Sequence, residues 1–458
     1  MLNHTTSIHH RDADALSSAG ARRKTHEAGP ADTYQPIFDG AYSLAYLGVL
    51  LFSIVYFGRP EDWMAGAAMI PFAKIAGILA MLGLVAGLAR RSHLHLSKEL
   101  LLLLLLFCQL CLALPFSTWK GGSFEIVINQ FSKVVMISFI LVQATNTWAR
   151  LRALMFVHVA AVLIITVVSS FGGRHIQTEG RLDGAIGGIF ANPNDLALNV
   201  ALVSPFCVFF LRTCRSILAR TIWLAALASI VYTVIATYSR SGFLSLLAAV
   251  SVSLWYFGLK QRRYALSIAV ILVAASLFAL APGRFASRMH SIVDSSLDEN
   301  GSYESRRELL NRSIEAALRH PLVGLGPGQF AAVAGGWHVA HNSYTELAAE
   351  AGSPALLIFL LVLGYTFRLT GQIMASTSVS PEYHLVAAAL RASLAAFVVA
   401  AFFASYEYQF FPYLLLGYVS ALCNIVIRQR NQPHALAPNT HQISRAAAPY
   451  VVATQPEY

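Results

Sequence analysis

Apolar runs of about twenty residues, the length of α-helix that spans a bilayer, alternate with short polar segments along most of this chain. Within lipid only helices and closed barrels satisfy all of their backbone groups. The pattern therefore predicts an all-α, polytopic membrane protein with about 12 transmembrane helices. We place these helices near residues 41–57, 64–89, 99–115, 124–143, 150–170, 192–211, 218–237, 241–259, 264–281, 343–367, 384–405 and 408–427.

Lysine and arginine are concentrated in alternate short loops between the apolar runs, for example at Arg90 and Arg91 and at Arg262 and Arg263. Loops that are rich in these residues lie on the cytoplasmic side of a membrane. The distribution therefore predicts that both termini are cytoplasmic. Residues 1–36 and 431–458 are polar and are predicted to be disordered tails that flank one membrane domain, residues 37–430.

The composition supports one membrane domain, since 56% of the residues are hydrophobic and only 12% are charged. A net charge of +10 is of the sign that favours nucleic acid, but the basic residues lie in loops beside apolar runs. We therefore expect membrane lipids as partners and no nucleic acid. The five cysteines lie in or beside apolar segments, which favours core packing over a disulfide framework. No sequence pattern typical of a metal or cofactor site is present, so none is expected.

Two segments on the predicted outer face are too long to be simple connectors, and loops of this length are usually functional or disordered. They are residues 171–191 and a large periplasmic loop at 282–342. The larger loop has helical periodicity over residues 303–320, and Pro321 is expected to end that helix. Its expected apolar face consists of Leu310, Ile314, Ala317 and Leu318. Such an amphipathic helix would lie on the membrane surface or cap a cavity.

Four arginines on this face are candidates for binding an anion. Arg240 stands between two apolar runs, where a cation is costly unless it reaches the interface or meets an anion. Arg306 and Arg307 are expected to project toward the apolar side of the amphipathic helix, and Arg181 precedes the segment FANPND. The simpler alternatives are an interfacial anchor for Arg240 and lipid head groups for Arg306 and Arg307.

His341 is the candidate for acid–base chemistry. It precedes a predicted helix in which Ser343 and Glu346 have the spacing of a capping box. The positive end of the helix dipole disfavours an imidazolium ion at this position. A neutral imidazole can accept a proton, as a general base must.

Together these segments resemble the O-antigen ligase and O-antigen polymerase superfamily of bacterial membrane glycosyltransferases. HNSYTELAAEAG at residues 341–352 is similar to the His-Asn motif of this family, although Ala355 stands where the family favours Gly, Thr or Tyr. SRSG at residues 239–242 is similar to the family's arginine at an outer helix end. Arg306 and the following PLVGLGPGQF resemble the large-loop motif, with Leu310 in the place of an aromatic residue. FANPND resembles the segment before a middle helix.

This resemblance implies a metal-independent, inverting glycosyltransferase in the bacterial inner membrane, with its active site on the periplasmic face. The donor would be a glycan on undecaprenyl diphosphate. Arg240 and Arg306, with Arg181 and Arg307, would bind the diphosphate. His341 would deprotonate the acceptor hydroxyl, supported by the residues Asn342, Ser343 and Glu346.

The acceptor differs within the family. Lipid A–core would make the protein an O-antigen ligase, which we favour. A growing polysaccharide would make it an O-antigen or exopolysaccharide polymerase, and a protein side chain would make it an O-glycosylating relative. A flippase or transporter for lipid-linked sugars is the alternative from another class. It would be favoured if Arg240, Arg306 and His341 lay far apart.

Overall fold

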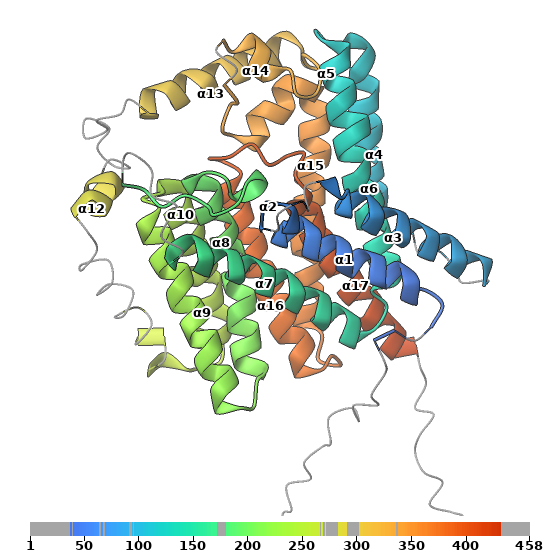
Figure 1. Cartoon of the computed structure of the whole chain (residues 1–458), viewed down its shortest axis with the longest axis vertical. Coiled ribbons are helices and arrows are strands. Elements are labelled where there is room, and N and C mark those ends of the chain that lie inside the picture. Colours follow the sequence, from blue (N-terminus) through green and yellow to red (C-terminus); the bar gives the residue numbers. More distant parts are fainter. Residues whose placement is uncertain are drawn as a thin grey trace, which may run out of the picture. The chain divides into compact units, whose positions relative to one another are not determined.

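The structure is a computed structural model that describes residues 37–431, apart from residues 39, 64–65, 67–68, 91–93, 95, 172–179, 266, 269–270, 272–282, 291–301 and 336–337. The regular elements of these residues are helices (Figure 1). Ten spans are long and apolar enough to cross a membrane, and a further apolar helix, Ser43–Gly58, is shorter. The predicted all-α, polytopic membrane protein is confirmed. The helix predicted at 264–281 lies largely outside the described residues.

The elements follow one another along the chain in this order: α1 (Ser43–Gly58), α2 (Pro60–Trp63), α3 (Phe72–Ala89), α4 (Lys98–Ala113), η2 (Leu114–Phe116), α5 (Lys120–Phe124), the π-helical η3 (Glu125–Phe131), α6 (Ser132–Ala144), α7 (Trp148–Phe171), η4 (Gly188–Phe190), α8 (Pro193–Thr213), α9 (Ile217–Ala236), α10 (Arg240–Ser253), the π-helical η5 (Leu254–Leu259), α12 (Gly283–His290), α13 (Ser302–Arg319), α14 (Phe330–Val333), α15 (Ser343–Ala375), α16 (Pro381–Ala400) and α17 (Phe410–Asn431).

Most predicted helix boundaries agree with these elements to within a few residues, but three differ. The predicted helix at 64–89 begins only at Phe72, because Pro71 precedes it. The predicted helix at 343–367 continues to Ala375. The predicted helix at 384–405 ends at Ala400, and the residues between α16 and α17 form a loop that reaches the candidate site.

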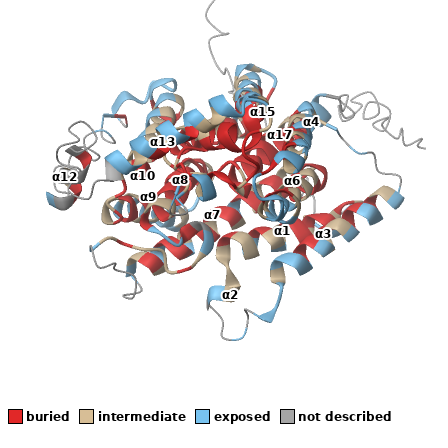
Figure 2. Cartoon of the chain, turned by 90° about the horizontal axis from the view of Figure 1, so that it is seen from above, coloured by how far each residue is buried: buried red, intermediate tan, exposed pale blue. Residues whose placement is uncertain are grey.

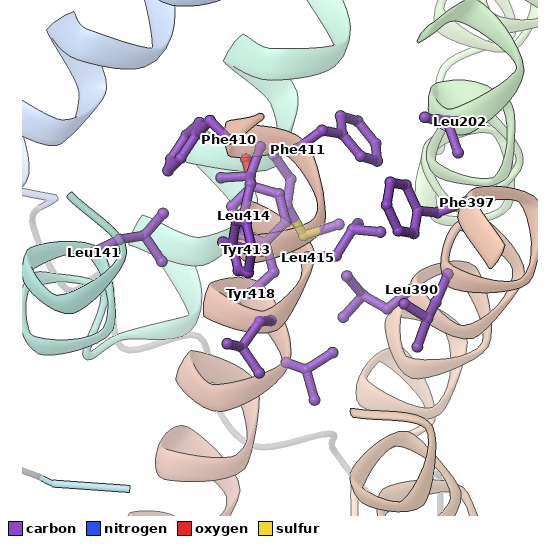
Figure 3. Close-up of a cluster of buried hydrophobic side chains, with 14 of the residues drawn as sticks. Leu141, Leu202, Leu390, Phe397, Phe410, Phe411, Tyr413, Leu414, Leu415 and Tyr418 are labelled. Carbon is purple, nitrogen blue, oxygen red and sulfur yellow. The ribbon is translucent and has the colours of Figure 1, made fainter. Parts of the chain in front are cut away.

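The interior of the described bundle is built around α17 and α8, whose spans are 89% and 78% buried, whereas only 28% of the α9 span is buried. Buried residues gather in the middle of the bundle, along α8, α15 and α17 (Figure 2). Figure 3 shows side chains of α17, among them Phe411 and Leu415, surrounded by residues of neighbouring helices such as Leu141, Leu202 and Phe397. Helices with a lower buried share expose leucine and isoleucine, as expected of surfaces that face lipid tails.

Helix α15 is interrupted near the end of the bundle that carries the candidate site. Gly352 has a φ of 83°, and a Cβ atom there would overlap the backbone of Leu322. The nine residues from Ser343 to Ala351 therefore form a separate half-helix before the chain bends. The side chain of Glu350 in this half-helix accepts hydrogen bonds from the backbone N–H groups of Gly328 (2.7 Å) and Phe330 (2.9 Å). This carboxylate thereby holds the glycine-rich turn at residues 324–328.

The amphipathic helix predicted in the large loop is α13, which lies over the start of α15 (Figure 1). Of its predicted apolar face, Ile314 and Leu318 are 42% and 76% exposed, so these two side chains do not pack on the described helices. The helix instead turns Leu309 and Ser313 inward, where Leu309 joins a small apolar cluster and Ser313 Oγ donates a hydrogen bond to Thr345 Oγ1 of α15 (2.8 Å). Contact with α15 thus sets the rotation of α13 and the direction of its arginines.

Candidate functional site

A cavity of about 250 Å³ lies between α8, α10, α13 and the residues before α15. We call it the arginine cavity. Its lining consists of Arg181, Asn194, Tyr238, Arg240, Ser305, Arg306, Leu309, His338 and His341. Three of the four arginines named from the sequence and the candidate base therefore meet in one place, although up to 160 residues separate them. The described lining holds three guanidinium groups and neither Asp nor Glu.

Asn194 connects two of these arginine-bearing segments. Its Oδ1 atom accepts hydrogen bonds from Arg181 Nη2 and from Ser239 Oγ, both at 3.0 Å. Arg181 Nε donates a further hydrogen bond to the Thr237 carbonyl (3.0 Å). Ser239 caps α10, of which Arg240 is the first residue. Arg181 is thus bonded to Thr237 and Asn194, while Arg240 follows Ser239, which also bonds to Asn194, so both arginines are positioned by residues 237–239 and Asn194.

The two neighbouring arginines of α13 point in different directions. Arg306 is half-buried and lines the arginine cavity, whereas Arg307 is exposed and lines neither of the cavities described here. The expectation that both project toward the apolar side is therefore wrong for Arg307. Ser313 and Leu309, which face inward, lie on the Arg306 side of the helix.

The start of α15 differs in detail from the predicted capping box. The N-cap is Asn342, whose Oδ1 atom accepts hydrogen bonds from the backbone N–H groups of Tyr344 and Thr345, both at 3.1 Å. Ser343 instead donates to the Ala404 carbonyl (2.6 Å) and so fixes the loop between α16 and α17. Glu346 accepts a hydrogen bond from the Ala340 N–H (3.0 Å). These three residues hold the chain on both sides of His341.

His341 itself is in the left-handed backbone region, with a φ of 52°. Burial, followed by the charge of Arg306 and by His338, lowers the pKa of His341 to about 4 from its ordinary value of 6.5. The sequence predicted a neutral imidazole from the helix dipole; in the structure, burial is the leading cause. An imidazole of this kind is a proton acceptor at neutral pH.

A second cavity of about 830 Å³ adjoins the first, and we call it the polar cavity. Arg181, Asn194 and His341 line both cavities. The polar cavity is also lined by Arg59, Glu61, Asp195, Tyr406 and Gln409, among others.

Backbone strain is concentrated around the two cavities. Arg59, Tyr238 and His341 are three of the four non-glycine residues with positive φ in the described part of the chain, and all three line a cavity. Such conformations are costly and cluster at functional sites. The strain marks the two cavities as one candidate site.

Sequence reasoning missed the contribution of the chain after α1 and of the loop before α17. Arg59-Pro60-Glu61-Asp62 is a charged run directly after an apolar run, a signal of the same kind as Arg240. No such signal marks Tyr406, whose hydroxyl donates to Asp195 Oδ1 (2.8 Å), because this pairing joins residues 211 positions apart. The residues described contain no group of three or more His, Cys, Asp or Glu that could hold a metal ion.

No curated protein matches this chain. Residues 222–360 match the family model described as O-antigen ligase. The matched segment contains Arg240, Arg306 and His341, and it includes α10, α13 and the first half of α15. The match supports a membrane glycosyltransferase of the O-antigen ligase or polymerase type. This match over residues 222–360 supports the O-antigen ligase superfamily, the family that the sequence resembles.

Proposed function

We propose that this protein transfers a glycan from undecaprenyl diphosphate to a hydroxyl of lipid A–core on the periplasmic face of the bacterial inner membrane. The observation that carries this proposal is the arginine cavity, in which Arg240, Arg306 and His341 lie together. A shared cavity is what a transferase needs to act on one bond. The wide separation of these residues that would favour a flippase or transporter is therefore not observed.

The arginine cavity suits a diphosphate. Guanidinium groups form paired, charge-assisted hydrogen bonds with phosphate oxygens. Arg181, Arg240 and Arg306 would bind the diphosphate of the donor and stabilise the negative charge that develops on it as the glycosidic bond breaks. In this reaction the three guanidinium groups take the part that a divalent cation plays in other transferases.

His341 would act on the acceptor. Its imidazole would accept the proton of the acceptor hydroxyl while that oxygen forms a bond to the anomeric carbon and the bond to the diphosphate oxygen breaks. Attack from the side opposite the leaving group inverts the configuration of that carbon. The polyprenyl tail would remain in the bilayer, so the membrane itself would bring donor and acceptor together.

Deletion of the gene, followed by analysis of the cell's glycolipids, tests this proposal. We expect uncapped lipid A–core in the deletion strain, restored capping with the wild-type gene, and no restoration with His341→Ala although that variant still inserts into the membrane. Lipid A–core capped by a single repeat unit would show that the protein is the polymerase. Full capping by His341→Ala would refute the assignment of the base.

A further inference from the structure

The two cavities differ in charge, and this difference bears on what each can hold. The arginine cavity is lined by three arginines and, in the part that the structure describes, by no carboxylate. The polar cavity is lined by Arg59 and Arg181 but also by Glu61 and Asp195. The charges of this second lining therefore balance, and an anion gains little there. Neutral hydroxyl groups, by contrast, find both donors and acceptors.

Glu61 is the carboxylate of this cavity that offers a free acceptor. Its Oε2 atom is buried and accepts no hydrogen bond from the residues that the structure describes. Its Oε1 atom lies 3.7 Å from Arg59 Nη2. Arg59 binds Asp62 more closely, since its Nε atom lies 2.7 Å from Asp62 Oδ2. Because Oε2 has almost no accessible surface, a ligand in the cavity would reach Oε1, which lies beyond hydrogen-bond distance of Arg59.

The backbone before α2 holds Glu61 in place. Arg59 has a φ of 44°, and Asp62 Oδ2 also accepts a hydrogen bond from the Gly187 N–H (2.9 Å). The hydrogen bond with Arg59 lowers the pKa of Asp62, so this link persists as an ion pair at neutral pH. The end of α1 is thereby tied to the loop before α8, on the wall of the polar cavity.

The position of the polar cavity relative to His341 gives it a place in the proposed reaction. His341, Arg181 and Asn194 form a wall common to both cavities. If the diphosphate lies among the arginines, inversion requires the attacking hydroxyl on the far side of the anomeric carbon. Because the polar cavity is also lined by His341, an acceptor held there would place its hydroxyl near the base.

We propose that the polar cavity is the acceptor subsite, that it takes an uncharged saccharide, and that Glu61 selects this saccharide by accepting a hydrogen bond from one of its hydroxyl groups. This inference rests on the proposed function and adds the chemical class of the acceptor. A phosphorylated sugar would meet the carboxylates of Glu61 and Asp195, because Arg59 is bound by Asp62 and Arg181 would already bind the diphosphate of the donor. Like charges brought together in a desolvated cavity repel strongly.

Purified protein in proteoliposomes tests the assignment. The donor is an undecaprenyl-diphosphate-linked oligosaccharide. The acceptors are lipid A–core, with and without phosphate on its outer sugar, and a second lipid-linked repeat unit. Binding of undecaprenyl diphosphate alone is measured separately. For Glu61→Gln we expect the acceptor KM to rise by about three- to tenfold, because the charge-assisted hydrogen bond becomes a neutral one, with the affinity for undecaprenyl diphosphate unchanged.

Selectivity is the readout that a merely structural role would not change. The wild type should favour the unphosphorylated acceptor by about tenfold or more, and Glu61→Gln should reduce that preference toward unity. Glu315→Gln is the matched control, because Glu315 is exposed on α13 and pairs with Arg319. If Glu61→Gln changes neither acceptor KM nor selectivity while the wild type transfers glycan, the subsite assignment is wrong and the proposed function stands. If the wild type transfers to none of these acceptors, both fail.

Discussion

At the scale of single residues, the proposed chemistry depends on keeping an imidazole neutral among cations. His341 shares its cavity with three arginines, and both its burial and the charge of Arg306 disfavour a second positive charge. The groups that would bind the donor therefore also keep the base unprotonated. One cavity could thus prepare both halves of the reaction.

The dependence of activity on pH follows from this arrangement. Because the pKa of His341 is lowered to about 4, its imidazole stays unprotonated well below the ordinary pKa of 6.5. We expect kcat/KM for transfer to stay level from neutral pH down to about 5 and to fall as the pH approaches the pKa. Initial rates in proteoliposomes across this range measure it. An acidic limb centred near the ordinary histidine value would mean that His341 is solvated, or that another group is the base.

Arg306 and Arg307 form a matched pair of adjacent arginines. Arg306→Ala removes a cation from the arginine cavity, and we expect transfer to fall by about 10²–10³-fold, as for the loss of one group that stabilises the transition state. Arg307→Ala removes an exposed cation that lines neither described cavity and should leave transfer within about twofold of the wild type. Equal losses in the two variants would indicate that α13 acts through its overall charge, for example on lipid head groups.

At the scale of elements, the half-helix at the start of α15 organises the site. It carries the cap at Asn342 directly after His341, and its Glu350 holds the glycine-rich turn below α13. The bend at Gly352 separates this short piece from the long remainder of α15. The backbone around His341 is therefore fixed by local contacts and not by the membrane span alone.

The bend predicts opposite effects for two glycines of α15. Gly352→Ala forces a side chain into a left-handed backbone against Leu322, and we expect a destabilisation of about 2–4 kcal/mol and a lower melting temperature in detergent. Gly364→Ala lies in the regular part of α15, where a Cβ atom meets nothing within 4 Å. Because alanine favours a helix over glycine, this variant should be as stable as the wild type or slightly more so. A Gly352→Ala protein with an unchanged melting temperature would show that the bend straightens at little cost.

The sequence predicted where the helices lie but not how the individual helix α13 is rotated. Helices were predictable because lipid demands long apolar runs. Arg240 stood out because a charge between such runs needs a reason, and His341 stood out because it precedes a capped helix N-terminus. The rotation of α13 could not be predicted, because the helical spacing of the sequence allows Leu310 and Ile314 to face inward as readily as Leu309 and Ser313. What decides between them is Thr345 and the apolar cluster on α15, partners brought near only by the fold.

At the scale of the whole molecule, the described bundle brings together segments that lie far apart in the sequence. Arg59 follows α1, Arg181 precedes α8, Arg240 begins α10 and His341 precedes α15, yet all four line one pair of adjoining cavities. Arg59, Arg240 and His341 lie at helix ends, and Arg181 is held at the end of α9 by its hydrogen bond to the Thr237 carbonyl. A stable bundle fixes its helix ends relative to one another. Such a site needs no large soluble domain.

We expect the site as a whole to draw its positive charge from arginine and not from a metal ion. If Arg181, Arg240 and Arg306 together stabilise the diphosphate, no divalent cation is needed for that purpose. We expect the initial rate of transfer by purified protein in proteoliposomes to stay within about twofold when EDTA is added. Arg240→Lys should lower the rate in the same assay, because lysine keeps the charge but loses the paired hydrogen bonds of a guanidinium. Activity lost with EDTA and restored by Mg²⁺ would contradict the arginine site, since it would assign the charge on the leaving group to a metal ion.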